Sequence, residues 1–123
     1  MTKGEQYTAH NNEHISEILT LYDYHVNYHL EGIKTKDFIR QDKQLYYQRW
    51  PVVEYKLDDE IAVQDLPDNE FKVVTFTTSF NVYNPEKENG IKGKALNTIK
   101  IRLINGDLKI IDEKQQVLSR KKY

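Results

Sequence analysis

The hydrophobic pattern of this chain changes period at Pro51, and this change constrains the fold more than any other feature of the sequence. Before Pro51, apolar residues recur at helical spacing in two segments, Glu13–Val26 and Thr35–Trp50. After Pro51, β-branched and aromatic residues follow strand patterns almost to the C-terminus. Helices followed by a run of strands predict an α+β fold, with the helices packed on one face of an antiparallel sheet.

Both predicted helices carry boundary signals. Asn11 or Asn12 can accept the first free amides of the first helix, and we expect residues 1–10, which are polar, to be frayed. Thr35 is suited to cap the second helix. Pro51 ends that helix, because the residue before a proline avoids the helical conformation.

The remaining elements are predicted to be strands. Alternating polar and apolar residues in Tyr24–Leu30 indicate a short strand between the helices. Asn105-Gly106 predicts a tight hairpin, since this pair supplies the positive φ angles of a type I′ turn. We expect Ser119–Tyr123 to be a short basic tail. The other predicted strands are Val52–Val63 (bent near Asp58), Phe71–Tyr83, Ile91–Ile104 and Leu108–Leu118.

Composition excludes several classes of protein. The 123 residues fit a single domain, 1–123. The 18 basic and 19 acidic residues argue against a general nucleic-acid binder. The chain has no cysteine, which removes disulfides, thiol nucleophiles and thiolate metal sites. No apolar run approaches the ~20 residues that span a bilayer, and the N-terminus lacks the apolar segment of a signal peptide. We therefore expect a cytoplasmic protein, or an exported one if a leader has been removed.

The second helix places two opposite charges within its apolar stripe. At 100° per residue, Asp42 and Arg49 lie in the middle of an arc that also carries Tyr46 and Trp50. A charge at the centre of a buried stripe is costly unless it is paired or hydrogen-bonded. Two interpretations stay open: a buried or half-buried salt bridge that fixes the helix against the sheet, or the polar floor of a cavity between helix and sheet. Trp50 is interpreted as a core residue more readily than as a ligand platform.

Histidines and tyrosines supply further polar groups. The four histidines form two i,i+4 pairs, His10 with His14 and His25 with His29, but no acidic residue is placed as a third ligand, so we predict no metal site. Tyrosine is abundant, with nine residues. Buried tyrosine hydroxyls need partners, so several of them could line a hydrogen-bonding cavity. No motif indicates a cofactor.

The segment Leu21–Pro51 resembles a largely uncharacterised group of small bacterial domains in the nuclear transport factor 2-like (cystatin-like) superfamily. The residues that carry the resemblance are Val26-x-Tyr28, Gly32 and Asp42-Lys43-x-x-Tyr46-x-x-Arg49-Trp50-Pro51. The resemblance implies a cone-shaped α+β barrel, in which N-terminal helices pack in a curved four- to five-stranded antiparallel sheet around a pocket. It also implies a homodimer formed through the outer face of the sheet. The superfamily includes enzymes similar to ketosteroid isomerase and scytalone dehydratase.

Three functions follow from these expectations. The first is a non-catalytic module that binds a small anionic or aromatic ligand, or a protein segment, with Arg49 receiving the anionic group. The second is a lyase or isomerase of ketosteroid isomerase-like type, with Asp42 or His29 as base and a tyrosine as donor. The third is an assembly domain with a filled cone. The predicted ligand-binding residues are Asn27, Tyr28, His29, Asp42, Tyr46, Arg49 and Trp50.

Overall fold

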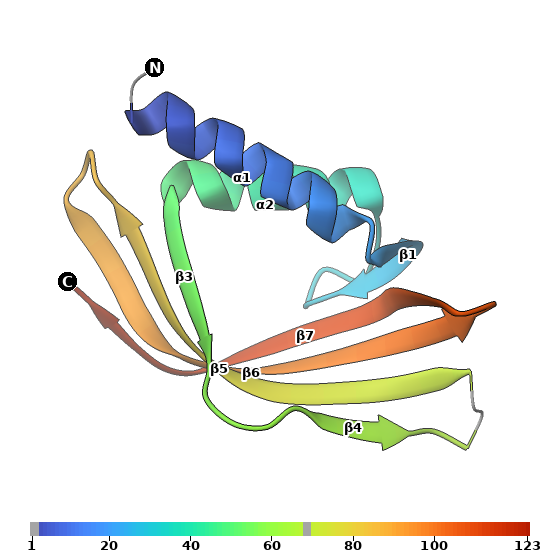
Figure 1. The fold of residues 1–123 in the computed structure, drawn as a ribbon. Helices are drawn as coiled ribbons and strands as arrows, with labels where there is room; N and C mark the ends of the chain where they lie inside the picture. Colours follow the sequence, from blue (N-terminus) through green and yellow to red (C-terminus); the bar gives the residue numbers. More distant parts are fainter. Residues whose placement is uncertain (1–2, 68–69) are drawn as a thin grey trace.

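A computed structural model describes the backbone of residues 3–67 and 70–123, and the side chains of residues 11–67 and 70–123. Two helices come early in the chain, and most of the remainder is strand (Figure 1). The helices are α1 (Lys3–Leu19) and α2 (Lys36–Arg49). The strands are β1 (Tyr22–Tyr28), β2 (Ile33–Thr35), β3 (Val52–Leu57), β4 (Ala62–Asp65), β5 (Phe71–Asn84), β6 (Asn89–Ile104) and β7 (Asp107–Lys122).

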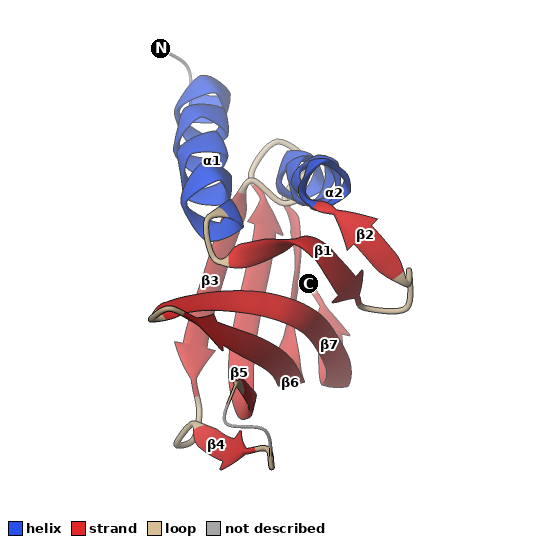
Figure 2. Cartoon of the chain, turned by 90° about the vertical axis from the view of Figure 1, so that its right-hand side faces the viewer, coloured by secondary structure: helices blue, strands red, loops and turns tan. Residues whose placement is uncertain are grey.

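The strands form one seven-stranded sheet in the order β2-β1-β7-β6-β5-β3, with β4 also paired to β5. The α+β class is confirmed, and both helices lie on the same side of the strongly curved sheet (Figure 2). The prediction of four to five antiparallel strands was too simple. The sheet is larger because β2 adds to β1 and because the predicted strand Val52–Val63 forms two strands, β3 and β4. The sheet is also mixed, since β1 pairs with β7 in parallel, across the long connection that a parallel pair needs.

The first helix is displaced from its predicted position. It begins at Lys3 instead of Glu13, so residues 3–10 are helical where fraying was expected, and it ends at Leu19. Asn11 therefore lies inside the helix and caps nothing; its side-chain amide donates to the Pro51 carbonyl at 3.0 Å. The helix stops where the chain joins the sheet, since the Leu21 carbonyl accepts the Ile110 amide at 2.7 Å.

The second helix follows its signals closely. The Phe38 amide donates to the Thr35 side-chain oxygen at 3.3 Å, which confirms Thr35 as the N-cap. The helix ends at Arg49, immediately before the Trp50-Pro51 step, as predicted.

Two predicted strand boundaries change, and the last predicted hairpin is confirmed. The stretch Val52–Val63 is two strands, because the chain leaves the β5 edge after Leu57 and returns at Ala62. The Asn105-Gly106 hairpin is confirmed, with φ values of 50° and 83°. Ser119 pairs with Lys94, so the expected basic tail is the end of β7 as far as Lys122.

Figure 1 shows β5, β6 and β7 bending together part-way along their length. A Cβ at Gly93 would lie 2.0 Å from the Ser119 carbonyl oxygen and 2.9 Å from the Phe80 ring, so only glycine fits. A register shift between Lys94 and Ala95 accompanies the bend, as expected where a bulge increases local curvature.

The core lies at one end of the molecule, where the helices meet β1. Ile15, Val26 and Ile39 are almost fully inaccessible to solvent and pack together with Leu19 and Tyr22. This cluster anchors α1 and β1 under α2. The C-terminal half of α2 lies over the inner face of the sheet, and the candidate site is located between them.

Candidate functional site

Two adjoining hollows lie between α2 and the inner face of the sheet. One has a volume of about 310 Å³ and the other about 290 Å³, and both are lined by Tyr46, Tyr55 and Gln115. Because they share these walls, we describe them as one trough with two ends. The His29 end is lined by Tyr28, His29, Asp42, Lys43, Tyr47 and Glu113. The Arg49 end is lined by Arg49, Trp50, Phe80, Val82, Ile91, Val117 and Arg120.

The His29 end is organised around the Glu113 carboxylate. The Tyr22 hydroxyl donates to Glu113, and His29 Nε2 lies 3.7 Å from Glu113 Oε1. The side chains of His29 and Glu113 are 32% and 24% exposed, so a ligand in the trough could contact both of them. A carboxylate beside an imidazole orients the ring and stabilises its protonated form.

Strand pairing brings these distant residues together. In the parallel register, Tyr28 lies opposite Glu113, and the His29 amide donates to the Glu113 carbonyl at 2.7 Å. His29 follows the end of β1 with φ 51°, an uncommon conformation for a residue with a side chain. The Lys114 ammonium donates to the His29 carbonyl at 2.6 Å and helps to hold this conformation.

Burial shifts the titration of the side chains at this end. It lowers the pKa of His29 and outweighs the Glu113 carboxylate, which favours the charged imidazole. Burial also raises the pKa values of Tyr22 and Tyr28, assisted by Glu113 for Tyr22 and by Asp42 for Tyr28. At neutral pH both tyrosines are therefore hydroxyl donors.

Asp42 faces the same end from α2. Its Oδ2 accepts the Tyr28 hydroxyl at 2.8 Å, and the Lys43 ammonium lies 5.6 Å and 5.9 Å from the ring centroids of Tyr22 and Tyr28. The His29 end thus combines two carboxylates, an imidazole, an ammonium and four phenols. Such a set can bind a hydroxyl or amine, or move a proton.

The expectation that Asp42 and Arg49 are buried was wrong, because both residues are exposed. They face an open trough instead of a closed core, so solvent reaches them. They also do not pair. Asp42 binds Tyr28, and Arg49 makes no ion pair in the part of the chain whose side chains are described. The salt-bridge interpretation is therefore excluded.

The Arg49 end is apolar and aromatic. Trp50 is buried, with 8% of its surface exposed, and the Arg49 guanidinium lies 5.4 Å from its ring centroid. The Tyr46 and Tyr55 hydroxyls are hydrogen-bonded to each other at the junction of the two ends, and burial raises the pKa of each. Arg120, which the sequence placed in a tail, lines this end from β7.

The trough brings together six of the seven predicted site residues. Asn27 is the exception, since side chains alternate along a strand and its amide donates to Asp112 Oδ2 at 3.0 Å, away from the trough. Tyr55 is one of the tyrosines that were expected to line a hydrogen-bonding cavity, and it lines both ends of the trough. Sequence reasoning missed Glu113 and Gln115, which come from β7, far along the chain. Their only signal is alternation on a predicted strand, which does not identify the partner strand.

Two features that would suggest other functions are not seen. Among the side chains of residues 11–67 and 70–123, no three histidine or acidic residues converge as metal ligands. Neither helix within the described backbone is long and apolar enough to cross a membrane.

Comparison with solved structures identifies the architecture. A proposed scytalone dehydratase from Novosphingobium aromaticivorans superposes with a TM-score of 0.74 at 11% identity, covering 96% of this chain and 80% of that one. An uncharacterised protein with a cystatin-like fold from Caulobacter vibrioides gives a TM-score of 0.71 at 11% identity, covering 93% and 82%. The chain has the nuclear transport factor 2-like, or cystatin-like, fold.

Another similar structure of this cystatin-like fold is a hexachlorocyclohexane dehydrochlorinase, LinA-type3, from Novosphingobium barchaimii LL02. Its TM-score is 0.72 at 9% identity, covering 92% of this chain and 79% of that one. No family model and no curated protein matches the sequence. At these identities the likeness concerns the cystatin-like fold alone, so function has to be argued from the trough itself.

Proposed function

We propose that this protein is a non-catalytic binding module whose trough takes a small organic molecule with an aromatic or apolar body and an anionic group. The observation that carries the proposal is the Arg49 guanidinium, which borders an aromatic hollow and has no carboxylate partner among the described side chains. Arginine recognises carboxylate and phosphate oxygens through two parallel hydrogen bonds. Pockets for small molecules are typically apolar with a few directed polar groups.

The dimensions of the trough support this ligand class. The two ends have volumes of about 310 and 290 Å³ and adjoin at Tyr46 and Tyr55. The body of a ligand would pack on these rings, with its anionic group at Arg49 and a hydroxyl or amine at Asp42 or Glu113. The open trough argues against the assembly alternative, which requires a filled cone. A protein segment could use the same aromatic walls, and it is an outcome of the test below.

The test is a search for bound molecules by native mass spectrometry, followed by thermal shifts with a panel of aromatic carboxylates. We expect at least one carboxylate to raise the melting temperature of the wild type, and Arg49→Met to abolish that shift while the protein stays folded. Arg40→Met is the matched control, since Arg40 lies on the exposed side of α2 near Ser16. If Arg49→Met binds the carboxylates as the wild type does, the proposal fails. If a peptide is captured and no carboxylate binds, the ligand is a protein segment.

A second candidate, a lyase or isomerase acting on a small molecule, is favoured by one specific observation. His29 and Glu113 form an imidazole–carboxylate pair within the trough, with the Tyr28 ring 4.4 Å from the imidazole. The LinA-type3 dehydrochlorinase and the proposed scytalone dehydratase have the same fold. The test is to incubate a bound ligand in heavy water and follow deuterium uptake or loss of a leaving group. His29→Gln should stop the conversion and spare binding if this candidate is correct.

We further propose a homodimer formed through the outer face of the sheet. Outward-facing side chains on the central part of β5 and β6 are only half-buried in the monomer, namely Val73, Thr75, Thr77, Leu96 and Thr98. Light scattering tests this: a dimer mass is expected for the wild type and a monomer mass for Leu96→Lys. A monomer mass for the wild type at high concentration would contradict it.

A further inference from the structure

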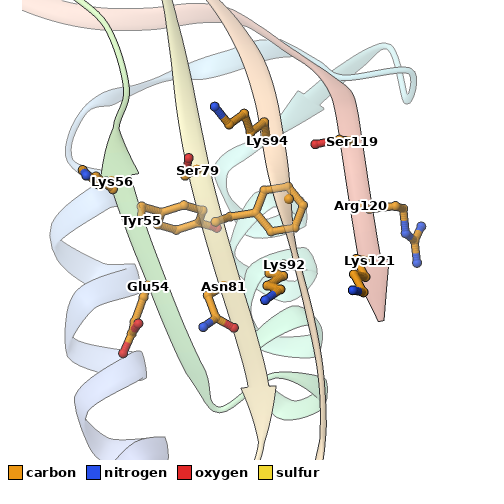
Figure 3. Close-up of a pocket in the computed structure, with 12 residues that line it drawn as sticks. Glu54, Tyr55, Lys56, Ser79, Asn81, Lys92, Lys94, Ser119, Arg120 and Lys121 are labelled. Carbon is orange, nitrogen blue, oxygen red and sulfur yellow. The ribbon is translucent and has the colours of Figure 1, made fainter. Parts of the chain in front are cut away.

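A further hollow of about 590 Å³ lies on the outer face of the sheet, across β3, β5, β6 and β7 (Figure 3). Side chains alternate along a strand, so Tyr55 and Phe80 point inward to the trough, and the residues immediately before and after each of them point outward. The outward residues form two rows of directly paired neighbours. These rows are Lys56–Ser79–Lys94–Ser119 and Glu54–Asn81–Lys92–Lys121.

The second row places two like charges side by side. Lys92 and Lys121 are direct cross-strand partners, a position in which side chains are about 5 Å apart at Cβ and like charges repel. Lys94 lies two residues along β6 on the same face and is held by Asp58 at 3.6 Å. Neither Lys92 nor Lys121 has an ion pair among the described side chains.

This concentration of charge is local. The chain as a whole has a formal net charge of −1, yet Glu54 is the only acidic residue among those lining the hollow. Lysines often protect an exposed sheet edge from aggregation, but Lys92 and Lys94 are on β6, which has neighbours on both sides. Edge protection therefore does not account for them.

An open strand edge lies beside the charges. β1 pairs with β7 only as far as Glu113, and over the rest of its described length β7 pairs with β6 alone. Residues 115–122, at the end of β7, are exposed. An extended peptide can add to such an edge through backbone hydrogen bonds, while its side chains on one face contact the sheet surface.

We propose that the outer hollow and the free edge of β7 together bind an acidic, extended segment of a partner protein. The backbone of the segment adds beside residues 115–122, and its alternate carboxylates reach Lys121 and Lys92. A second copy of this chain is not the occupant of the hollow, because pairing the hollow with itself would bring the same lysines against each other. The homodimer proposed above uses another part of the outer face, at Val73, Thr75, Thr77, Leu96 and Thr98. The hollow shares Tyr55, Phe80 and Arg120 with the trough, but Lys92 and Lys121, which carry this proposal, do not line the trough. The two proposals can therefore fail independently.

The test uses a fluorescein-labelled hexaglutamate peptide and fluorescence anisotropy. We expect the wild type to bind it more weakly as salt rises, since the charges are exposed. The double variant Lys92→Gln/Lys121→Gln should weaken peptide binding about tenfold, because it removes two exposed charge pairs with the peptide. The control is Lys36→Gln/Lys87→Gln, which has the same net charge and removes lysines outside the hollow; it should bind like the wild type.

Several results would overturn the proposal. They are absence of peptide binding to the wild type, equal loss of binding in both double variants, and equally tight binding of a single-stranded oligonucleotide of the same charge. Hydrogen exchange gives an independent readout, because strand addition should slow exchange of the backbone amides in residues 115–122. Unchanged exchange there in the bound complex would exclude strand addition. Thermal shifts with the aromatic carboxylates should be unaffected in the Lys92/Lys121 double variant, which separates this site from the trough.

Discussion

The Tyr28 hydroxyl donates a 2.8 Å hydrogen bond to Asp42 and so joins the end of β1 to the middle of α2. The Tyr28 side chain is otherwise part of the core, with 3% of its surface exposed. One residue therefore contributes both to the stability of the fold and to the polar wall of the trough.

The first prediction concerns this bond. Tyr28→Phe keeps the ring and removes the hydroxyl, so it should lower the free energy of unfolding by about 0.5–1.5 kcal/mol. The cost stays small because Asp42 is exposed and can bind water instead. Urea denaturation measures the change. Tyr24→Phe, at a site that is 77% exposed, is the control and should leave stability unchanged; an equal loss in both variants would argue against the assigned bond.

Acid should destabilise the protein through His29. Burial holds the pKa of His29 below its ordinary value of 6.5, even though Glu113 and Asp42 favour the charged ring, and Lys43 and Lys114 add to the lowering. Below pH 6.5 the unfolded chain takes up a proton that the folded protein resists, so stability falls as the pH drops toward the folded pKa. Well above pH 6.5 the effect is absent, because His29 is neutral in both the folded and the unfolded chain.

Denaturation midpoints measured across this acidic window check the effect. His29→Gln should flatten the part of the pH dependence that His29 causes. His25→Gln is the control, because His25 is exposed on the other side of β1. A wild-type profile that His29→Gln leaves unchanged would show that other groups cause the acid sensitivity.

Alkali should also destabilise the fold, through tyrosines. Burial raises the pKa of Tyr47 to about 12 and also raises those of Tyr22, Tyr28, Tyr46 and Tyr55 above the ordinary value of 10.0. Above pH 10 the unfolded chain loses phenolic protons that the folded protein keeps, so stability falls as the pH rises. Phenolate absorbance should show a late group of tyrosines that titrates together with unfolding. Titration of all nine tyrosines near the ordinary value in the folded protein would contradict this.

The helix–sheet core should be sensitive at Ile39. This residue is fully buried between α1, α2 and β1, and Ile39→Ala should cost about 2–5 kcal/mol through lost burial and the cavity left behind. Leu45→Ala on the same helix is the control, since Leu45 is 66% exposed and should change stability little. Thermal or urea unfolding compares the two, and similar losses would place the core elsewhere.

Local signals in the sequence determined the elements whose boundaries depend on neighbouring residues. The Thr35 cap and Pro51 define α2 because each acts on its own backbone, and Asn105-Gly106 defines the last hairpin because positive φ is a property of those two residues. Alternation also identified the long strands β5 and β6. It placed Tyr28 in a short strand, and helical spacing placed Asp42, Tyr46 and Arg49 on one side of the next helix. Both elements border the trough.

Only the tertiary structure decided what faces these residues. Glu113 meets His29 because β1 adds in parallel to β7, and no local pattern specifies a pairing across so long a stretch of chain. The exposure of Asp42 and Arg49 was missed for the same kind of reason: a helical stripe shows which side faces inward, but not whether the sheet opposite closes against it. The close approach of β6 and β7 at Gly93 was likewise decided by the tertiary structure, since a Cβ there would lie 2.0 Å from the Ser119 carbonyl oxygen of the neighbouring strand.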